Sequence, residues 1–149
     1  MKLRLQVQYA SRRPAPGTAS IRRWARAALA DVRARELGIG VRIVNERESA
    51  ALNTRYRRKR KSTNVLAFPF EPPPGAASPV LGDLVICAPV VNREAKAKSV
   101  ASAAHWAHMV VHGIMHLRGY DHQSRREAAI MERKETAVLK GLGFADPYT

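Results

Sequence analysis

The sequence predicts an α/β (α+β-like) fold: one layered domain, residues 1–149, in which a mixed sheet of about four strands packs with about five helices. Three observations support this prediction. A chain of 149 residues is long enough to bury one ordinary core without disulfides. Segments with strand periodicity alternate with segments of helix periodicity. Neither an internal repeat nor a second zone of composition divides the chain, so we expect a single domain.

The first elements follow from the spacing of apolar residues. Polar and apolar residues alternate over positions 2–9, which predicts a half-buried strand. Apolar residues over 21–32 then form one helical stripe, and we expect this helix to end near Gly38 and Gly40. The apolar residues at 41–44 predict the second strand.

The middle of the chain contains two more predicted strands. A short helix over 46–53 precedes the third strand, at 65–68, and the prolines at 69–74 then enforce a loop. Residues 81–87 predict the fourth strand, and Pro89 is well placed to open a helix.

Two helices complete the domain. The first should run from about 101 to 117 and end at Gly119, a residue suited to the left-handed position after a helix. Ser124 and Glu127 form a capping-box pattern for the last helix. The apolar face of that last helix includes Ala128, Met131, Val138 and Leu142.

The charge of the chain indicates a polyanionic partner. Lys and Arg number 26 against 12 Asp and Glu, a net charge of +14, which attracts nucleic acid or an acidic membrane surface. Six of the seven residues at 55–61 are cations, so we expect an exposed loop or arm there. The candidates for phosphate contacts in this arm are Arg55, Arg58, Lys59, Arg60 and Lys61.

Two features bear on the location of the protein. No run of about 18 apolar residues exists, so the sequence predicts no membrane span. The single cysteine, Cys87, cannot form an internal disulfide, so the cytoplasm is the simplest expectation. The Cys87 side chain itself is expected in the core.

All five histidines fall between positions 105 and 122. His112 and His116 are one helical turn apart, about 6 Å, and can converge on one ion. His108 and His116 are eight residues apart, about 12 Å, and cannot share it. The third ligand must come from outside the helix, and a reversal at Gly119 can bring back His122.

Three imidazoles leave one coordination position for water, the layout of a catalytic zinc site on the helix near 101–118. We therefore expect one Zn²⁺ per chain, although Ni²⁺, Co²⁺ and Cu²⁺ accept the same ligands. His105 and His108 are then second-sphere or structural. The pattern lacks the glutamate of the zinc-protease motif H-E-x-x-H, because Gly113 stands in its place, which disfavours peptide hydrolysis.

The residues around the histidines resemble one known family. Residues 112–122, HGIMHLRGYDH, closely resemble the H-G-x-x-H-L-x-G-Y-D-H signature of the bacterial rRNA-maturation endoribonucleases called YbeY. Further similar stretches lie at 105–111 (HWAHMVV), Leu52-Asn53, Tyr56-Arg57, 63–69 (TNVLAFP) and Gly82-Asp83-Leu84.

The resemblance implies a small α/β fold, one zinc held by the three motif histidines, and single-strand-specific cleavage of RNA. It also implies maturation of ribosomal RNA, particularly the 16S 3′ end, and ribosome quality control beside the small ribosomal subunit and an assembly GTPase. The functional arginine of the family carries over onto Arg57. The family often has an acidic residue soon after it, where this chain continues with the cations at 58–61.

A mechanism follows from these residues. Zinc lowers the pKa of bound water toward about 7 or polarises a phosphoryl oxygen, and the RNA 2′-OH is a second possible nucleophile. Either route builds negative charge, which suits the guanidinium of Arg57. The catalytic candidates are thus Arg57 and the zinc ligand His112.

Four further side chains have open roles. Asp121 can orient a ligand imidazole, accept a proton or cap the following helix. Asn64 can face the site from the third strand. Tyr56 can stack on a splayed base or pack in the core. Asp83 is expected either as a buried hydrogen-bonding group or near the cleft.

Two other classes of function compete with an endoribonuclease. One is a ribosome-assembly binding factor in which zinc is chiefly structural. The other is a zinc hydrolase of a non-RNA substrate, which the charge and Gly113 disfavour.

Overall fold

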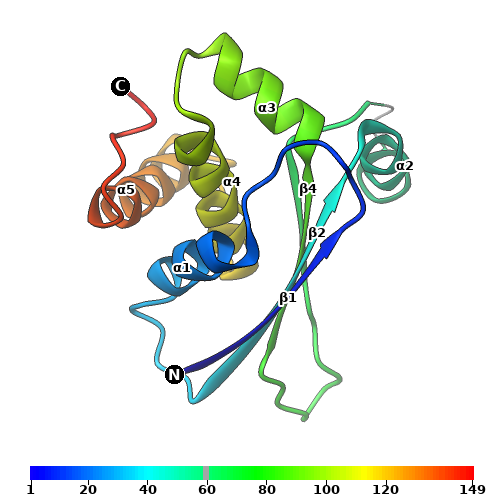
Figure 1. Ribbon diagram of the computed structural model, residues 1–149. Helices are drawn as coiled ribbons and strands as arrows, with labels where there is room; N and C mark the ends of the chain where they lie inside the picture. The colour runs from blue at the N-terminus through cyan, green and yellow to red at the C-terminus, as the bar shows by residue number, and fades with distance from the viewer. Residues whose placement is uncertain (59–60) are drawn as a thin grey trace.

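A computed structural model describes residues 1–58 and 61–149 (Figure 1). The elements, in chain order, are β1 (Lys2–Tyr9), α1 (Thr18–Ala28), β2 (Glu36–Val44), α2 (Glu46–Arg57), β3 (Val65–Pro69), β4 (Val80–Cys87), α3 (Ala88–Ala97), α4 (Ser102–Leu117) and α5 (Arg125–Gly141). The predicted single layered domain with a four-stranded mixed sheet and five helices is confirmed in the part of the chain that the structure describes.

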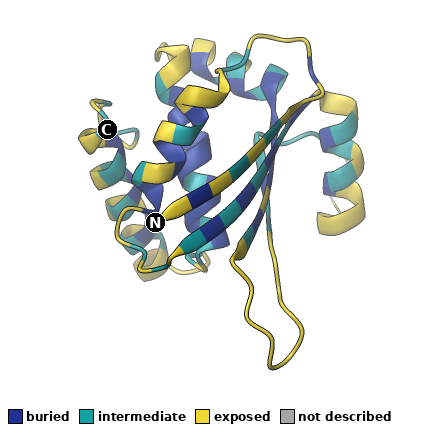
Figure 2. Cartoon of the chain, turned by 60° about the horizontal axis from the view of Figure 1, so that its bottom comes forward, coloured by how far each residue is buried: buried dark blue, intermediate teal, exposed yellow. Residues whose placement is uncertain are grey.

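The sheet has the strand order β1-β2-β4-β3. β1 and β4 both run parallel to β2, whereas β3 pairs antiparallel with β4 and forms one edge of the sheet. The 70–79 loop that joins β3 to β4 is exposed and extends well away from the body of the protein (Figure 2).

The two faces of the sheet differ because side chains alternate along each strand. The face covered by α1 and α4, with α5 packed behind these two helices, contributes the main core, which includes Leu3, Ile39, Val41, Ile43, Leu84 and Ile86. The opposite face, here called the outer face, bears Arg4, Gln6 and Gln8 of β1, Arg42 of β2 and Asp83 of β4. Helix α2 packs on the outer face, with Leu52 against a small cluster of Val44, Leu66, Val85 and Cys87, and Val90 of α3 also packs against this cluster.

Helix α4 lies at the centre of the main core. It contacts α1, α3 and α5 as well as β3 and β4, and Trp106, Val110 and Ile114 are completely or almost completely buried. The predicted bounds and the expected stop at Gly119 are confirmed, since this glycine has a φ of 95°. The predicted cap of α5 is also confirmed, because the Glu127 backbone N–H donates to Ser124 Oγ.

The first helix is shorter than predicted. α1 ends at Ala28, and the two glycines expected to terminate it lie instead inside β2. A side chain at Gly40 would not fit, because its Cβ atom would clash with Asp83 Oδ1 on the neighbouring strand. Gly40 therefore makes room for the Asp83 side chain within the sheet and does not mark the end of a helix.

The second helix is longer than predicted. α2 continues to Arg57, so Arg55, Tyr56 and Arg57 belong to its last turn and not to an exposed arm. The next residue, Arg58, caps the helix with a left-handed φ of 57°. The predicted arm is thus wrong for these three residues, since a run of cations is compatible with a helix that has only one side covered. Lys59 and Arg60 lie outside the described residues.

Within the described ranges, none of the helices has both the length and the apolar character needed to cross a membrane.

Candidate metal centre

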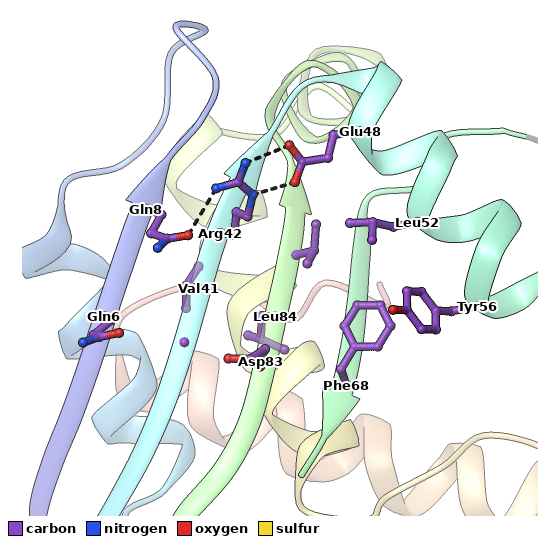
Figure 3. Close-up of a pocket in the computed structure, with 12 residues that line it drawn as sticks. Gln6, Gln8, Val41, Arg42, Glu48, Leu52, Tyr56, Phe68, Asp83 and Leu84 are labelled. Carbon is purple, nitrogen blue, oxygen red and sulfur yellow. Dashed lines mark hydrogen bonds and ion pairs between the residues drawn. The ribbon is translucent and has the colours of Figure 1, made fainter.

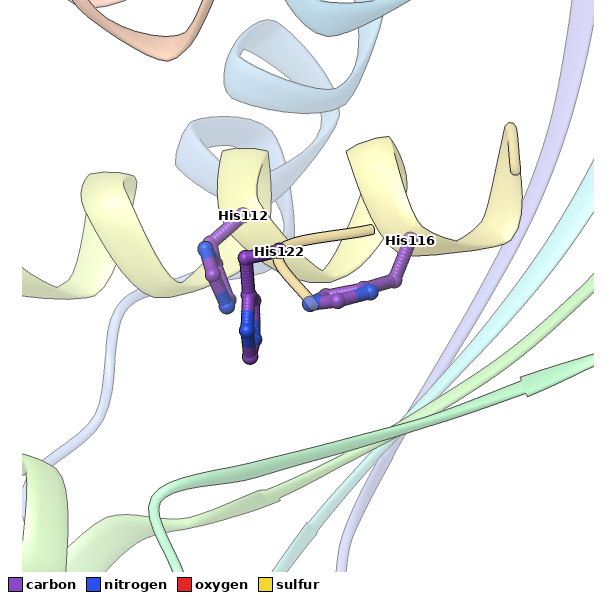
Figure 4. Close-up of side chains that lie close together, drawn as sticks. All are labelled: His112, His116 and His122. Atoms are coloured by element: carbon purple, nitrogen blue, oxygen red, sulfur yellow. The ribbon is translucent and has the colours of Figure 1, made fainter. Parts of the chain in front are cut away.

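Three histidine side chains converge beside the C-terminal end of α4 (Figure 4). His112 and His116 lie one turn apart on that helix, and the reversal at Gly119 returns the chain so that His122 faces them. The ring centroids are 4.7 Å apart for His112 and His116 and 5.1 Å for His116 and His122. One ring nitrogen from each lies within 4.8 Å of those of the other two, which fits three ligands of one ion.

The chemistry of these donors also fits a metal, since a metal ligand must be a neutral imidazole with a free lone pair. Burial, together with the neighbouring rings of His112 and His122, lowers the pKa of His116. His112 Nδ1 lies 2.6 Å from Glu135 Oε1. An ionised carboxylate can only accept, so Nδ1 carries the proton and Nε2 keeps the lone pair for an ion.

Glu135 is the functional residue that the sequence analysis missed. Its side chain, on α5, is completely buried. Burial would raise the pKa of this carboxyl, but the imidazoles of His108 and His112 outweigh it and lower that pKa to about 2. The Tyr148 hydroxyl donates to Oε2 at 2.6 Å. A buried carboxylate that fixes a ligand histidine is a common partner of metal sites.

A signal for Glu135 was present in the sequence. It lies four residues from both Met131 and Leu139, which are the other two buried residues of α5. A charged residue in the apolar stripe of a helix needs a buried partner, and the nearby histidines on α4 supply it.

The remaining two histidines support neighbouring groups. His108 Nε2 is 3.2 Å from the Tyr148 hydroxyl and 3.6 Å from Glu135 Oε1. His105 Nε2 is 2.9 Å from Glu94 Oε1, and Glu94 also accepts from Asn64 Nδ2 at 3.2 Å. His108, His112 and Glu135 also come close enough to hold an ion. The 2.6 Å contact between His112 and Glu135 is a hydrogen bond, so we assign the metal site to the other triad.

A cavity of about 460 Å³ opens over the triad, between α4 and the edge strand β3. This metal cavity is lined by the three histidines and by Arg57, Asn64, Gly113 and Asp121, among others. The structure therefore brings Arg57 to the predicted site from a distant part of the chain. The exposed side chains of Arg55, Arg58 and Lys61 do not line it, in the portion of the chain that is described.

Two predicted residues near the triad have defined hydrogen bonds. Asp121 Oδ1 accepts the backbone N–H of its neighbour His122 at 2.7 Å, so this carboxylate shapes the turn that presents the ligand. Its alternative role as a helix cap is wrong, because Ser124 caps α5. Asn64 Oδ1 accepts the Val65 N–H at 2.7 Å, and its Nδ2 donates to Glu94, so the amide is held at the start of β3.

Gly113 has a packing role. A Cβ atom here would lie 2.7 Å from Leu84 Cδ2 and 3.2 Å from Val65 Cγ2, because α4 lies very close to the sheet at this point. A glutamate in this position, as in a zinc protease, would have to displace the side chains of Leu84 and Val65. Packing thus supports the argument against a peptidase.

Two other expectations concern the sheet. Cys87 is buried in the small cluster beneath α2, as predicted. Asp83 is exposed on the outer face, so both predicted positions for it, buried or near the cleft, are wrong. Neighbouring side chains on a strand point to opposite faces, and Leu84 points to the main core, so Asp83 points to the outer face.

Comparisons with known proteins agree with the resemblance. The profile of the family described as Endoribonuclease YbeY matches residues 8–143. A Methylococcus capsulatus protein named Endoribonuclease YbeY is 54% identical over 144 residues, covering 97% of this chain and 94% of that protein. One of the same name from Alkalilimnicola ehrlichii is 52% identical over 151 residues, covering 98% and 91%.

A solved structure has a similar fold. The solution structure of TM1509 from Thermotoga maritima aligns with a TM-score of 0.58 at 20% identity, covering 97% of this chain and 99% of that one.

Proposed function

The chain belongs to the Endoribonuclease YbeY family and is accordingly an RNA-cleaving hydrolase, and on this premise we propose that it is a zinc-dependent, single-strand-specific enzyme. We further propose that it acts in maturation of the 16S rRNA 3′ end and in ribosome quality control. The single observation that carries the chemical part is the convergence of the three histidines and Arg57 in one cavity.

Zinc is the ion we assign to the triad. Three imidazole nitrogens without a thiolate match a catalytic zinc site with one position left for water or substrate. When bound, zinc would polarise a phosphoryl oxygen or activate water. The hydrogen bond from His112 to buried Glu135 makes that imidazole a better donor and fixes its orientation.

We assign to Arg57 the role of stabilising the negative charge that develops on the phosphate. Its guanidinium is always protonated and presents several N–H donors toward phosphate oxygens. Because Arg57 is in the last turn of a helix, its backbone is fixed before RNA arrives, unlike that of a residue on a free arm. Arg55, Arg58 and Lys61 are exposed nearby and supply contacts to phosphates further along the strand.

The segment that follows α2 is anchored to this helix. Ser49 Oγ donates to the Thr63 carbonyl at 3.1 Å, and Asn53 Nδ2 donates to the Lys61 carbonyl at 2.8 Å. These two side chains are almost completely buried. They keep the end of α2 and the start of β3 in register, and so hold Arg57 and Asn64 on one wall of the metal cavity.

The proposed partners follow from the family and the charge. A net charge of +14 favours association with ribosomal RNA, and we propose the small ribosomal subunit and its assembly factors as partners in the cytoplasm.

A cleavage assay tests the chemical proposal. Zinc-loaded wild type, Arg57→Ala and Arg23→Ala are compared on a single-stranded RNA and on the same RNA in a duplex. Arg23 is an exposed arginine on α1, so its loss matches the change in charge away from the cavity. We expect the Arg57 variant to lose about 10²–10³-fold in rate, as for a lost donor to a developing anion, and the Arg23 variant to match wild type.

Equal rates for both arginine variants would contradict the role of Arg57. A chain that holds zinc but cleaves neither substrate would instead indicate the binding factor with a structural metal. Depletion of the protein in cells, followed by mapping of 16S 3′ ends, tests the biological part: we expect unprocessed ends that wild type restores and the Arg57 variant does not.

A further inference from the structure

A second cavity, of about 530 Å³, lies on the outer face of the sheet (Figure 3). We call it the outer-face pocket. Tyr56 of α2 and Phe68 of β3 form one side, Gln6 and Gln8 of β1 the other, and Asp83 of β4 lies between them. The cavity does not share a lining residue with the metal cavity among the described residues.

The same two elements nevertheless contribute to both cavities. In the last turn of α2, Tyr56 lines the outer-face pocket and its neighbour Arg57 lines the metal cavity. In β3, Phe68 lines the pocket and its neighbour Ala67 lines the metal cavity. Since β3 is an edge strand, one extended ligand can pass from one cavity to the other along this side of the protein.

The aromatic side of the pocket is accessible. Tyr56 is 57% exposed, and its ring meets Phe68 edge-on, with centroids 5.2 Å apart and planes at 70°. Arg55 places its guanidinium carbon 5.4 Å from the Tyr56 centroid. The guanidinium thus lies over the Tyr56 ring, so a base stacked on this ring shares it with a cation that can neutralise a neighbouring phosphate.

The charges inside the pocket disfavour a phosphate. Arg42 is paired with Glu48 through two contacts of 2.5 and 2.9 Å and also donates to Gln8 Oε1 at 3.1 Å. The Arg42–Glu48 pair is neutral as a unit, so the carboxylate of Asp83 is the net charge of the lining. An anion is therefore repelled from the pocket, whereas the cations Arg55 and Arg57 attract it at the rim.

Two polar groups in the pocket are available to a ligand. Among the described residues, the side chains of Asp83 and Gln6 have no hydrogen-bond partner. Asp83 stands beside Gly40, whose missing side chain leaves the space that the carboxylate occupies. A carboxylate accepts from an exocyclic amino group such as cytosine N4, and the Gln6 amide can both donate and accept.

We propose that the outer-face pocket binds an unpaired nucleobase of the RNA, stacked on Tyr56 with the Phe68 ring nearly perpendicular beside it, and with an amino group directed at Asp83. This inference rests on the proposed function, which places the RNA phosphate at Arg57 in the metal cavity. A base can enter the pocket only when it is free of its partner strand. The pocket thus supplies a physical reason for a preference for single strands and favours cytosine over uracil near the cleaved bond.

Equilibrium binding of short 2′-O-methyl oligonucleotides to the zinc-loaded chain tests the proposal: these ligands cannot be cleaved through the 2′-OH, and their length is checked after each titration to exclude cleavage by water. Oligo(C) and oligo(U) of about eight nucleotides, within the usual size of a single-strand site, are titrated at several salt concentrations. The variants are Tyr56→Ala, Tyr56→Phe and Asp83→Asn. Tyr9→Ala is the matched control, since Tyr9 is 46% exposed on β1 and lines neither cavity.

We expect Tyr56→Ala to weaken binding roughly 5- to 150-fold, the range for one lost stacking contact, while Tyr56→Phe and Tyr9→Ala bind like wild type. The slope of log K against log salt should stay the same in Tyr56→Ala and become shallower by about 0.7 in Arg57→Ala, which loses a phosphate contact. Asp83→Asn should reduce the preference for oligo(C) over oligo(U).

Tyr56→Ala that binds both oligonucleotides as tightly as Tyr9→Ala would overturn the proposal. So would a change in salt slope as large as that of Arg57→Ala, because the ring would then act only through its neighbouring cations. Either result leaves RNA cleavage by the same protein intact. Failure to cleave any RNA would instead contradict the proposed function.

Discussion

Replacement of Glu135 by glutamine should weaken zinc binding. In the wild-type chain, His112 Nδ1 lies 2.6 Å from Glu135 Oε1. Glu135→Gln keeps the size of the side chain and an oxygen that can accept this hydrogen bond, but it removes the negative charge. A hydrogen bond to a charged group contributes about 1.5–3 kcal/mol and a neutral one about 0.5–1.5 kcal/mol. The difference, about 1–2 kcal/mol, corresponds to a roughly 5- to 30-fold higher Kd for zinc.

Competition of the chain with a chromophoric zinc chelator measures this effect. Glu132→Gln is the matched control, because Glu132 lies on the same helix and is exposed. Urea unfolding of the metal-free variants shows whether a weaker site reflects a less stable fold. A zinc Kd for Glu135→Gln within twofold of that for Glu132→Gln would refute the argument that the buried carboxylate tunes the ligand.

Three further predictions concern stability. Gly113→Ala should lower the free energy of unfolding in urea by about 1–3 kcal/mol, because the new Cβ atom would crowd Leu84. Gly141→Ala is the control, since a Cβ atom there has open space and should not lower this free energy. Equal effects of the two substitutions would refute the packing argument. The hydrogen bond from Arg118 lowers the pKa of Asp31 to about 2, so Asp31→Asn should cost up to about 1 kcal/mol at neutral pH. That cost should vanish as the pH falls from 4 through 2, and a pH-independent cost would contradict it. Chelation of the metal should lower the Tm in calorimetry, and an unchanged Tm would mean that no metal was bound to the folded chain.

The parts of the site that the sequence predicts are those set by local geometry. His112 and His116 are one turn apart on a helix whose periodicity is clear, and Gly119 marks the reversal that brings His122 back. Ligand spacing of this kind depends on a few consecutive residues. The helix and the triad were therefore predictable without tertiary information.

The parts that the sequence did not predict depend on contacts between distant segments. Glu135 meets its partner His112 across 23 residues, so periodicity could only have marked it as a charged residue in an apolar stripe. The end of α2 was misplaced because a run of cations suggests an exposed arm, although Leu52 packs the helix against the sheet. Asp83 was misplaced because the face of a strand residue follows from register, which pairing with β2 decides.

Zinc titration coupled to RNA cleavage tests the central claim most directly. Metal-free wild type and His116→Ala receive increasing zinc, and bound metal and the rate of single-stranded RNA cleavage are measured on the same samples. We predict that wild-type activity rises to a plateau at one zinc per chain, while His116→Ala loses both zinc and activity. Full cleavage by His116→Ala without bound zinc would contradict the account.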